Sequence, residues 1–351
     1  MTRANLPQSP SVYNSVILLP SPLIYQEHPM KQNARIFVTR KLPVAVEQRL
    51  ARDYQCDFNA TDTLYNAEEL VQRSADCDAI LCCHTEKLNE SVIAALPESI
   101  RVIANFSVGV DHCDLDAARA RKIIVTNTPD VLSDSTAEIA MLCMLGAARR
   151  GGEGYSLVRR DGWHDWSPTF MLGKQVTGKR FGIVGMGRVG QVTARRARGF
   201  DMEVHYHNRN RLDAELEQGA IYHQTLESLL SVSDVLSLHC PNNPDSVGLL
   251  NAARIAQLPD GAIVVNTARG TVVDDEALVE ALRSGKVWAA GLDVFNNEPS
   301  GIHPAYRELP NVFVLPHLGS ATEQTRDAMG FRALDNLDAI FSGREAGDRV
   351  A

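Results

Sequence analysis

The sequence has no excess of positive charge and no apolar run long enough to cross a membrane. Its 351 residues include 35 Lys and Arg against 43 Asp and Glu, a net charge of −8, which argues against general binding to nucleic acid or to a membrane surface. A membrane helix needs roughly 18 consecutive apolar residues, whereas two prolines interrupt the apolar stretch at 16–25. We therefore expect no membrane span and no nucleic-acid partner.

The sequence also lacks the patterns of a disulfide framework or a metal centre. Its seven cysteines are odd in number and include no C-x-x-C pair, so we predict buried free thiols in a cytoplasmic protein. The ten histidines form no H-E-x-x-H motif and no cluster with cysteine. We predict that the protein binds no metal.

What remains is the composition of an ordinary globular protein, 44% hydrophobic and 22% charged, without internal repeats. The length predicts about two domains. We expect residues 1–33 to be a loosely ordered extension, and a start of translation at Met30 is one interpretation of this segment.

The first part of the chain alternates short apolar runs with helical periodicity. Strands are expected at 35–39, 78–83, 101–105 and 122–126, and helices near 43–53, 66–75, 88–96 and 114–120. Alternation of this kind predicts parallel strands covered by helices. Residues 34–130 are therefore expected to form a first α/β domain.

A long apolar helix at 130–150 is expected to carry the chain into a second domain, 131–319, through an irregular arm at 151–178. Further strands are expected at 181–184, 202–207, 235–239, 262–266, 288–294 and 312–315. This pattern predicts a doubly wound parallel sheet of six or seven strands.

A last helix is expected to open with a capping box at Ser320-Ala-Thr-Glu323 and to run to about Phe341. No later strand needs this helix. We therefore expect residues 320–351 to pack back on the first domain and to complete it.

The most informative motif is GMGRVG at 185–190, which lies between a strand and a helix. In a dinucleotide fold the first glycine allows the tight turn, the second lets the backbone approach a diphosphate, and the third lets the helix pack on the strand. The diphosphate then lies at the helix N-terminus. The predicted cofactor contacts in this turn are Gly185, Gly187, Arg188, Val189 and Gly190.

The end of the next strand indicates which dinucleotide is preferred. An NAD-selective site places Asp or Glu there, whereas an arginine accepts a 2′-phosphate. This chain has Asn208, Arg209 and Arg211 and no carboxylate at that point, which favours NADP(H) with NAD(H) as a possible second cofactor. The alternative is that both arginines are merely solvated.

Three residues that suit the reduction of a 2-oxo acid follow strands of the second sheet. Arg269 is expected to bind the substrate carboxylate, because a guanidinium fork matches planar oxygens. His317 is expected to protonate the ketone oxygen as hydride arrives. Glu298 is expected to hydrogen-bond the other imidazole nitrogen and to favour the imidazolium.

These motifs resemble the D-isomer-specific 2-hydroxyacid dehydrogenases. The resemblance covers residues 35–343 and rests on GMGRVG, NTARG at 266–270, GLDVF at 291–295 and PHLGSAT at 316–322. It implies two doubly wound parallel-sheet domains, a flavodoxin-like substrate domain and a Rossmann cofactor domain. It also implies that Arg269, Glu298 and His317 are the catalytic residues.

The resemblance implies further roles. Val108 and Gly109 look like the loop whose backbone N–H groups hold the substrate carboxylate. The remaining cofactor contacts that it implies are Thr136, Cys240, Pro241, Thr267, Asp293 and Gly319, with Asp293 near the nicotinamide amide. Members are typically homodimers paired through the cofactor domain, with 151–178 as the dimerisation arm.

Within the family, GWHDWSP at 162–168 and NRNR at 208–211 resemble the glyoxylate/hydroxypyruvate reductases that prefer NADPH. Trp166 of the arm is the candidate to reach a partner's substrate site; alternatively, Trp163 and Trp166 only anchor the arm. Two other functions stay open. One is a D-3-phosphoglycerate-type dehydrogenase, and the other is a non-catalytic, NAD(H)-sensing corepressor with the same fold.

Overall fold

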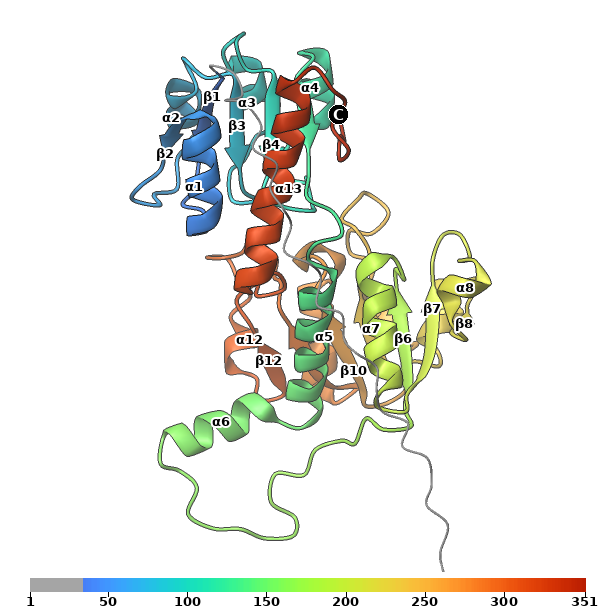
Figure 1. The fold of residues 1–351 in the computed structure, drawn as a ribbon. Helices are drawn as coiled ribbons and strands as arrows, with labels where there is room; N and C mark the ends of the chain where they lie inside the picture. Colours follow the sequence, from blue (N-terminus) through green and yellow to red (C-terminus); the bar gives the residue numbers. More distant parts are fainter. Residues whose placement is uncertain (1–33) are drawn as a thin grey trace, which may run out of the picture.

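The computed structural model describes residues 34–351, so the expected extension at 1–33 lies outside the described residues. The chain forms two parallel sheets, one above the other in Figure 1, with helices on their faces. None of the helices between residues 34 and 351 is long and apolar enough to span a membrane.

The first sheet has five strands in the order β2-β1-β3-β4-β5, the order of flavodoxin-like folds. Its elements are β1 (Arg35–Val38), α1 (Val44–Asp53), β2 (Gln55–Phe58), α2 (Ala67–Arg73), β3 (Ala79–Cys82), α3 (Glu90–Ala95), β4 (Val102–Asn105), α4 (Leu115–Ala120) and β5 (Ile124–Thr126). The sequence did not indicate β2. Its residues QCDF are half-buried at the sheet edge and mix polar with apolar side chains, which hides the strand pattern.

The second sheet has seven strands in the order β12-β11-β10-β9-β6-β7-β8, a Rossmann order with one added edge strand. Its strands are β6 (Arg180–Val184), β7 (Glu203–His207), β8 (Ile221–Tyr222), β9 (Val235–Leu238), β10 (Ala262–Asn266), β11 (Val287–Leu292) and β12 (Val312–Val314). The helices between them are α7 (Arg188–Arg198), α8 (Ala214–Glu217), α9 (Leu226–Leu230), α10 (Ala252–Ile255), α11 (Asp275–Ser284) and α12 (Ala305–Glu308), with a 3-10 turn at Gly270–Val272.

Helix α5 (Ser133–Ala148) packs against α7, β10 and β11, and most of its residues are buried. Helix α6 (Gly151–Arg159) follows it and projects with its loop from the body of the molecule (Figure 1). The expectation of an irregular arm at 151–178 was wrong for this helix. Its segment GGEGYSLVR contains three glycines, which disfavour helix, so propensity hid it.

Helix α13 (Glu323–Phe341) returns to the first sheet, as expected, and shares a hydrophobic core with α1 and β4. Met329, Leu334 and Leu337 of α13 are buried with Val46 and Leu50 of α1. The expected capping box is wrong by two positions. Thr322 rather than Ser320 is the N-cap, and its side chain accepts the N–H of Thr325.

Candidate active site

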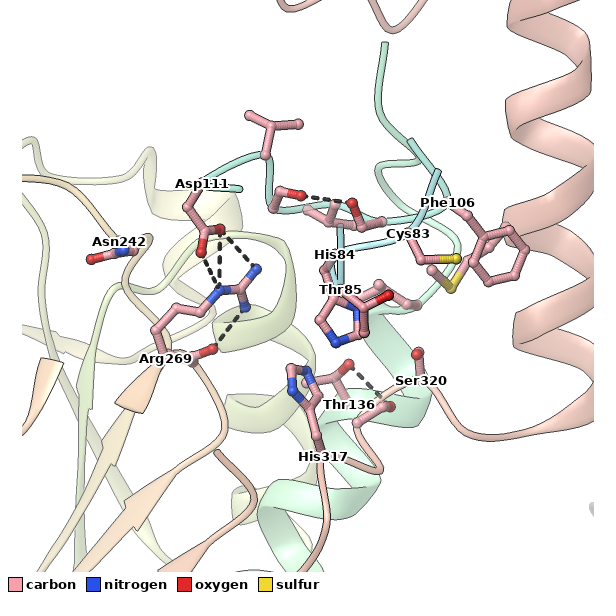
Figure 2. Close-up of a pocket in the computed structure, with 18 of the residues that line it drawn as sticks. Cys83, His84, Thr85, Phe106, Asp111, Thr136, Asn242, Arg269, His317 and Ser320 are labelled. Carbon is pink, nitrogen blue, oxygen red and sulfur yellow. Dashed lines mark hydrogen bonds and ion pairs between the residues drawn. The ribbon is translucent and has the colours of Figure 1, made fainter. Parts of the chain in front are cut away.

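A cavity of about 810 Å³ is lined by residues that follow strands of both sheets. From the first sheet come the loops at 83–85 and 106–111, and from the second come loops that hold Arg269 and His317 (Figure 2). Ligands of doubly wound sheets bind beyond the carboxyl ends of the strands. The cavity therefore has the position of a substrate and cofactor site.

The sequence-predicted residues divide into two groups with respect to this cavity. Those that line it are Val108, Gly109, Thr136, Val189, Cys240, Pro241, Thr267, Arg269, His317 and Gly319. Those outside its lining are Gly185, Gly187, Arg188, Gly190, Asn208, Arg209, Arg211, Asp293, Glu298 and Trp166.

His317 and Glu298 are hydrogen-bonded. Nδ1 of His317 lies 2.5 Å from Oε1 of Glu298, and the N–H of Phe295 donates to Oε2 of the same carboxylate at 2.9 Å. Burial raises the pKa of Glu298, but the hydrogen bond and charge of His317 outweigh it, so the pKa lies below its ordinary value. The pair thus leaves Nε2 of His317 as the nitrogen that can exchange a proton with a ligand.

The backbone of His317 has a left-handed conformation, with φ at 55°. A non-glycine residue keeps such a conformation only where its surroundings hold it. Here the N–H of His317 donates to Asp293 O, and the two carboxylate oxygens of Asp293 accept the N–H groups of Leu318 and Gly319 at 2.7 and 2.8 Å. Asp293 therefore fixes the loop that presents His317, a role that the sequence did not indicate.

Arg269 follows β10 and contacts the opposite wall of the cavity. Its Nε and Nη2 atoms donate to the carboxylate of Asp111 at 3.2–3.3 Å, and Nη1 donates to Ala268 O at 2.8 Å (Figure 2). Asp111 belongs to the SVGVD segment, in which the sequence assigned a role only to Val108 and Gly109.

His84 lies beside His317, with ring centroids 5.0 Å apart. Burial, with help from the charges of His317 and Arg269, lowers the pKa of His84 to about 4, so its imidazole is neutral at pH 7. One ligand atom from each of His84, Glu298 and His317 lies within 4.8 Å of the others, a grouping that could hold a metal ion. Sequence analysis paired Glu298 with His317 but missed His84, because His84 comes from a distant segment in the first sheet.

The glycine turn has the geometry expected of a diphosphate site. Gly185 has a φ of 90°, a backbone conformation that favours glycine because it has no side chain. A Cβ at Gly187 would meet no atom within 4 Å, whereas a Cβ at Gly190 would lie 2.6 Å from Gly185 O. Gly187 thus faces open space at the start of α7, and Gly190 allows the helix to pack on β6. Arg188 forms an ion pair with Asp130.

Two side-chain atoms on residues that line the cavity have no hydrogen-bond partner although they are buried. They are Nδ1 of His239 and Oγ1 of Thr267. An unpaired buried polar atom costs free energy, so we expect a bound ligand or water to pair these two atoms. The sequence suggested Thr267 as a cofactor contact and missed His239, which ends the apolar run before Cys240.

The polar side chains of the segment after β7 differ in their hydrogen-bond partners. Asn208 Oδ1 accepts the N–H of Met186 at 2.6 Å and so closes the glycine turn. Arg211 is held by Glu217 at 2.7 and 3.0 Å. Arg209 is exposed and makes no hydrogen bond or ion pair with another residue of 34–351.

The arm exposes several large apolar side chains. Trp166 is 68% exposed and Trp163 is 54% exposed, and both lie outside the lining of the cavity in this chain.

All seven cysteines are free, as expected; four are buried and three are half-buried.

Comparison with known proteins agrees with this geometry. A family model described as D-isomer specific 2-hydroxyacid dehydrogenase, NAD binding domain, matches residues 141–319. The chain is 42% identical to a glycerate dehydrogenase of Hyphomicrobium methylovorum over 89% of this chain and 97% of that one. It is 38% identical to a glyoxylate reductase of Pyrococcus furiosus over 88% of this chain and 93% of that one.

Solved structures agree as well. A D-isomer specific 2-hydroxyacid dehydrogenase from Polaromonas is 45% identical with a TM-score of 0.87, covering 91% of this chain and 100% of that one. A second structure is that of an NADPH-dependent glyoxylate/hydroxypyruvate reductase from Sinorhizobium meliloti in complex with NADP and malonate. It is 34% identical with a TM-score of 0.80, covering 91% of this chain and 97% of that one.

Proposed function

The chain belongs to the D-isomer-specific 2-hydroxyacid dehydrogenases, and from its site we propose that it reduces glyoxylate and hydroxypyruvate to their 2-hydroxy acids with NADPH. The observation that carries the proposal is that His317, which is hydrogen-bonded to Glu298, lines the same cavity as Arg269. The pair provides a proton donor, and the arginine provides a cation for the substrate carboxylate.

The residues present fit a bound dinucleotide. Gly187 faces open space at the helix N-terminus, and the unpaired atoms of His239 and Thr267 match the polar groups of such a ligand. Arg209 has no competing partner among the described residues and is the proposed contact for a 2′-phosphate. NADPH, when bound, supplies the hydride.

In the proposed mechanism Arg269 binds the carboxylate of the 2-oxo acid and orients its ketone. His317 donates the Nε2 proton to the ketone oxygen, where negative charge develops. Glu298 holds Nδ1 of His317 and compensates the charge of the imidazolium. In the reverse direction the same pair accepts the proton of the 2-hydroxy acid.

We further propose a cytoplasmic homodimer paired through the cofactor domain. The exposed apolar side chains of the arm, Trp163 and Trp166 among them, support it because such residues are enriched in interfaces. A native mass of one chain in light scattering would contradict the dimer. If Trp166 also reaches the partner's cavity, Trp166→Ala raises KM while Trp163→Ala does not.

The decisive experiment is a panel of 2-oxo acids, including 3-phosphohydroxypyruvate, with NADPH and with NADH. We expect many turnovers per second with glyoxylate or hydroxypyruvate. Less than about one turnover per minute with every acid would favour the non-catalytic corepressor. The phosphorylated acid belongs in the panel because Arg326, which has no acidic partner within 34–351, also lines the cavity.

A further inference from the structure

Asp111 joins the two walls of the cavity. It lies in the loop after β4, and its carboxylate accepts hydrogen bonds from Nε and Nη2 of Arg269 in the loop after β10. The dashed lines of Figure 2 show the carboxylate above the guanidinium, on the side of the first sheet. The substrate-binding arginine is thus held by a residue of the opposite wall.

The hydrogen-bond donors of the guanidinium show what this contact leaves free. Arginine has five N–H donors. Asp111 takes the Nε donor and one on Nη2, and Ala268 O takes one on Nη1. One donor remains on each terminal nitrogen. These two donors together form the end of the fork, which can bind one carboxylate with both oxygens.

The loop that carries Asp111 is itself fixed close to the arginine. Ser107 Oγ donates to Gly109 O at 2.7 Å, and Asn127 Nδ2 donates to Val108 O at 2.8 Å. A Cβ at position 109 would lie 1.8 Å from Nη2 of Arg269. A side chain at position 109 would therefore displace the guanidinium from its place beside the backbone where the substrate carboxylate is expected.

Asp111 carries the charge that this role requires. Burial raises the pKa of its carboxyl, but the charge and hydrogen bonds of Arg269 outweigh burial and hold the pKa below its ordinary value. The carboxylate is therefore ionised at neutral pH, and it is an acceptor only.

We propose that Asp111 is a positioning residue that holds the guanidinium of Arg269 by its Nε edge and so turns the terminal N–H groups toward the carboxylate of the substrate. Asp111 itself does not touch the substrate. This inference rests on the proposed function, because it assigns to Arg269 the binding of a 2-oxo acid.

The first test is Asp111→Asn, which keeps the shape but replaces one acceptor oxygen by a donor. Loss of charge-assisted hydrogen bonds predicts a fall of about 10- to 100-fold in kcat/KM, mainly through KM, with unchanged NADPH affinity. The control is Asp116→Asn on α4, whose carboxylate pairs with exposed Arg119 and with no other residue of 34–351. A kcat/KM of Asp111→Asn within twofold of the control would overturn the proposal.

The second test asks whether Asp111 acts through Arg269. In an Arg269→Gln background, adding Asp111→Asn should change kcat/KM by less than about twofold, because no fork is left to orient. Additive losses would show that Asp111 acts independently and would refute the positioning role. The losses in kcat/KM would also be additive if Asp111 only stabilised the fold.

Failure of the proposed function is separable from failure of this inference. Oxamate, a 2-oxo acid analogue that accepts no hydride, serves as a probe that needs no turnover. With saturating NADPH, Asp111→Asn should weaken oxamate binding in calorimetry by about tenfold or more. Equal affinity for both proteins would overturn the inference even if the wild type reduces glyoxylate rapidly.

Discussion

Oε1 of Glu298 lies 2.5 Å from Nδ1 of His317, so the carboxylate occupies one ring nitrogen and leaves Nε2 as the other. The hydrogen bond and the charge of His317 outweigh burial and hold the pKa of Glu298 below its ordinary value. The carboxylate that contacts the imidazole is therefore ionised at neutral pH. In the proposed mechanism this carboxylate is the counter-charge of the imidazole that donates the proton.

Glu298→Gln should move the high-pH limb of the reduction profile to lower pH. In the proposed mechanism reduction needs the imidazolium. The amide removes its counter-charge, so the rate is expected to fall at a lower pH than in the wild type. The measurement is kcat/KM for reduction from pH 5 to 10. Glu308→Gln, outside the cavity, is the control. Superimposable normalised profiles would remove Glu298 from this role.

Arg209→Ala should weaken NADPH binding by about tenfold and leave NADH nearly unchanged, because only NADPH has the 2′-phosphate. Arg211→Ala is the matched comparison. Its side chain is engaged by Glu217, so we expect a smaller effect on NADPH. Fluorescence titration gives both dissociation constants. An equal loss of NADPH and NADH in Arg209→Ala would contradict the 2′-phosphate contact.

Gly187→Ala should lose affinity for the cofactor, whereas Gly190→Ala should lose thermal stability. A Cβ at Gly187 meets no protein atom, so the variant should keep its melting temperature and lose affinity for NADPH. A Cβ at Gly190 lies 2.6 Å from Gly185 O, so that variant should melt at a lower temperature. Thermal unfolding without cofactor, followed by NADPH titration, checks both. A lower melting temperature for Gly187→Ala would show that position 187 serves packing.

Asp348→Asn should destabilise the protein by about 1 kcal/mol, since Asp348 is buried and accepts hydrogen bonds from Arg332 and Asn336. The bonds from Arg332 hold the pKa of Asp348 below its ordinary value. The stabilisation is therefore complete above the unfolded pKa of about 3.9 and disappears as pH falls through the folded pKa.

Thermal melts of Asp348→Asn from pH 7 to pH 3 test this expectation, with exposed Glu345→Gln as the control. The difference in melting temperature between Asp348→Asn and the wild type should be constant between about pH 7 and 5 and should narrow below about pH 4. A difference in melting temperature that widens in acid would contradict this expectation.

The sequence predicted the parts of the molecule in which local pattern and tertiary structure agree. Buried strands such as β10 (AIVVN) are recognisable because every residue is apolar or enclosed. The edge strand β2 was missed because its half-buried residues mix polar with apolar side chains. Helix α6 was missed because its three glycines disfavour helix.

The same distinction holds within the site. Arg269 and His317 could be found because each follows a recognisable strand within a motif. The contacts of Asp111 with Arg269 and of His84 with His317 join the loops of two separate sheets. No local sequence pattern encodes such a contact, so these partners were visible only in three dimensions.

The return of α13 to the first sheet has a consequence for the order in which the protein can fold during synthesis. The core formed by Val46 and Leu50 includes Met329, Leu334 and Leu337, so it cannot close until the ribosome has released the chain past residue 341. Residues 140–315 can bury their own core earlier. The nascent chain would thus complete its later sheet before its earlier one.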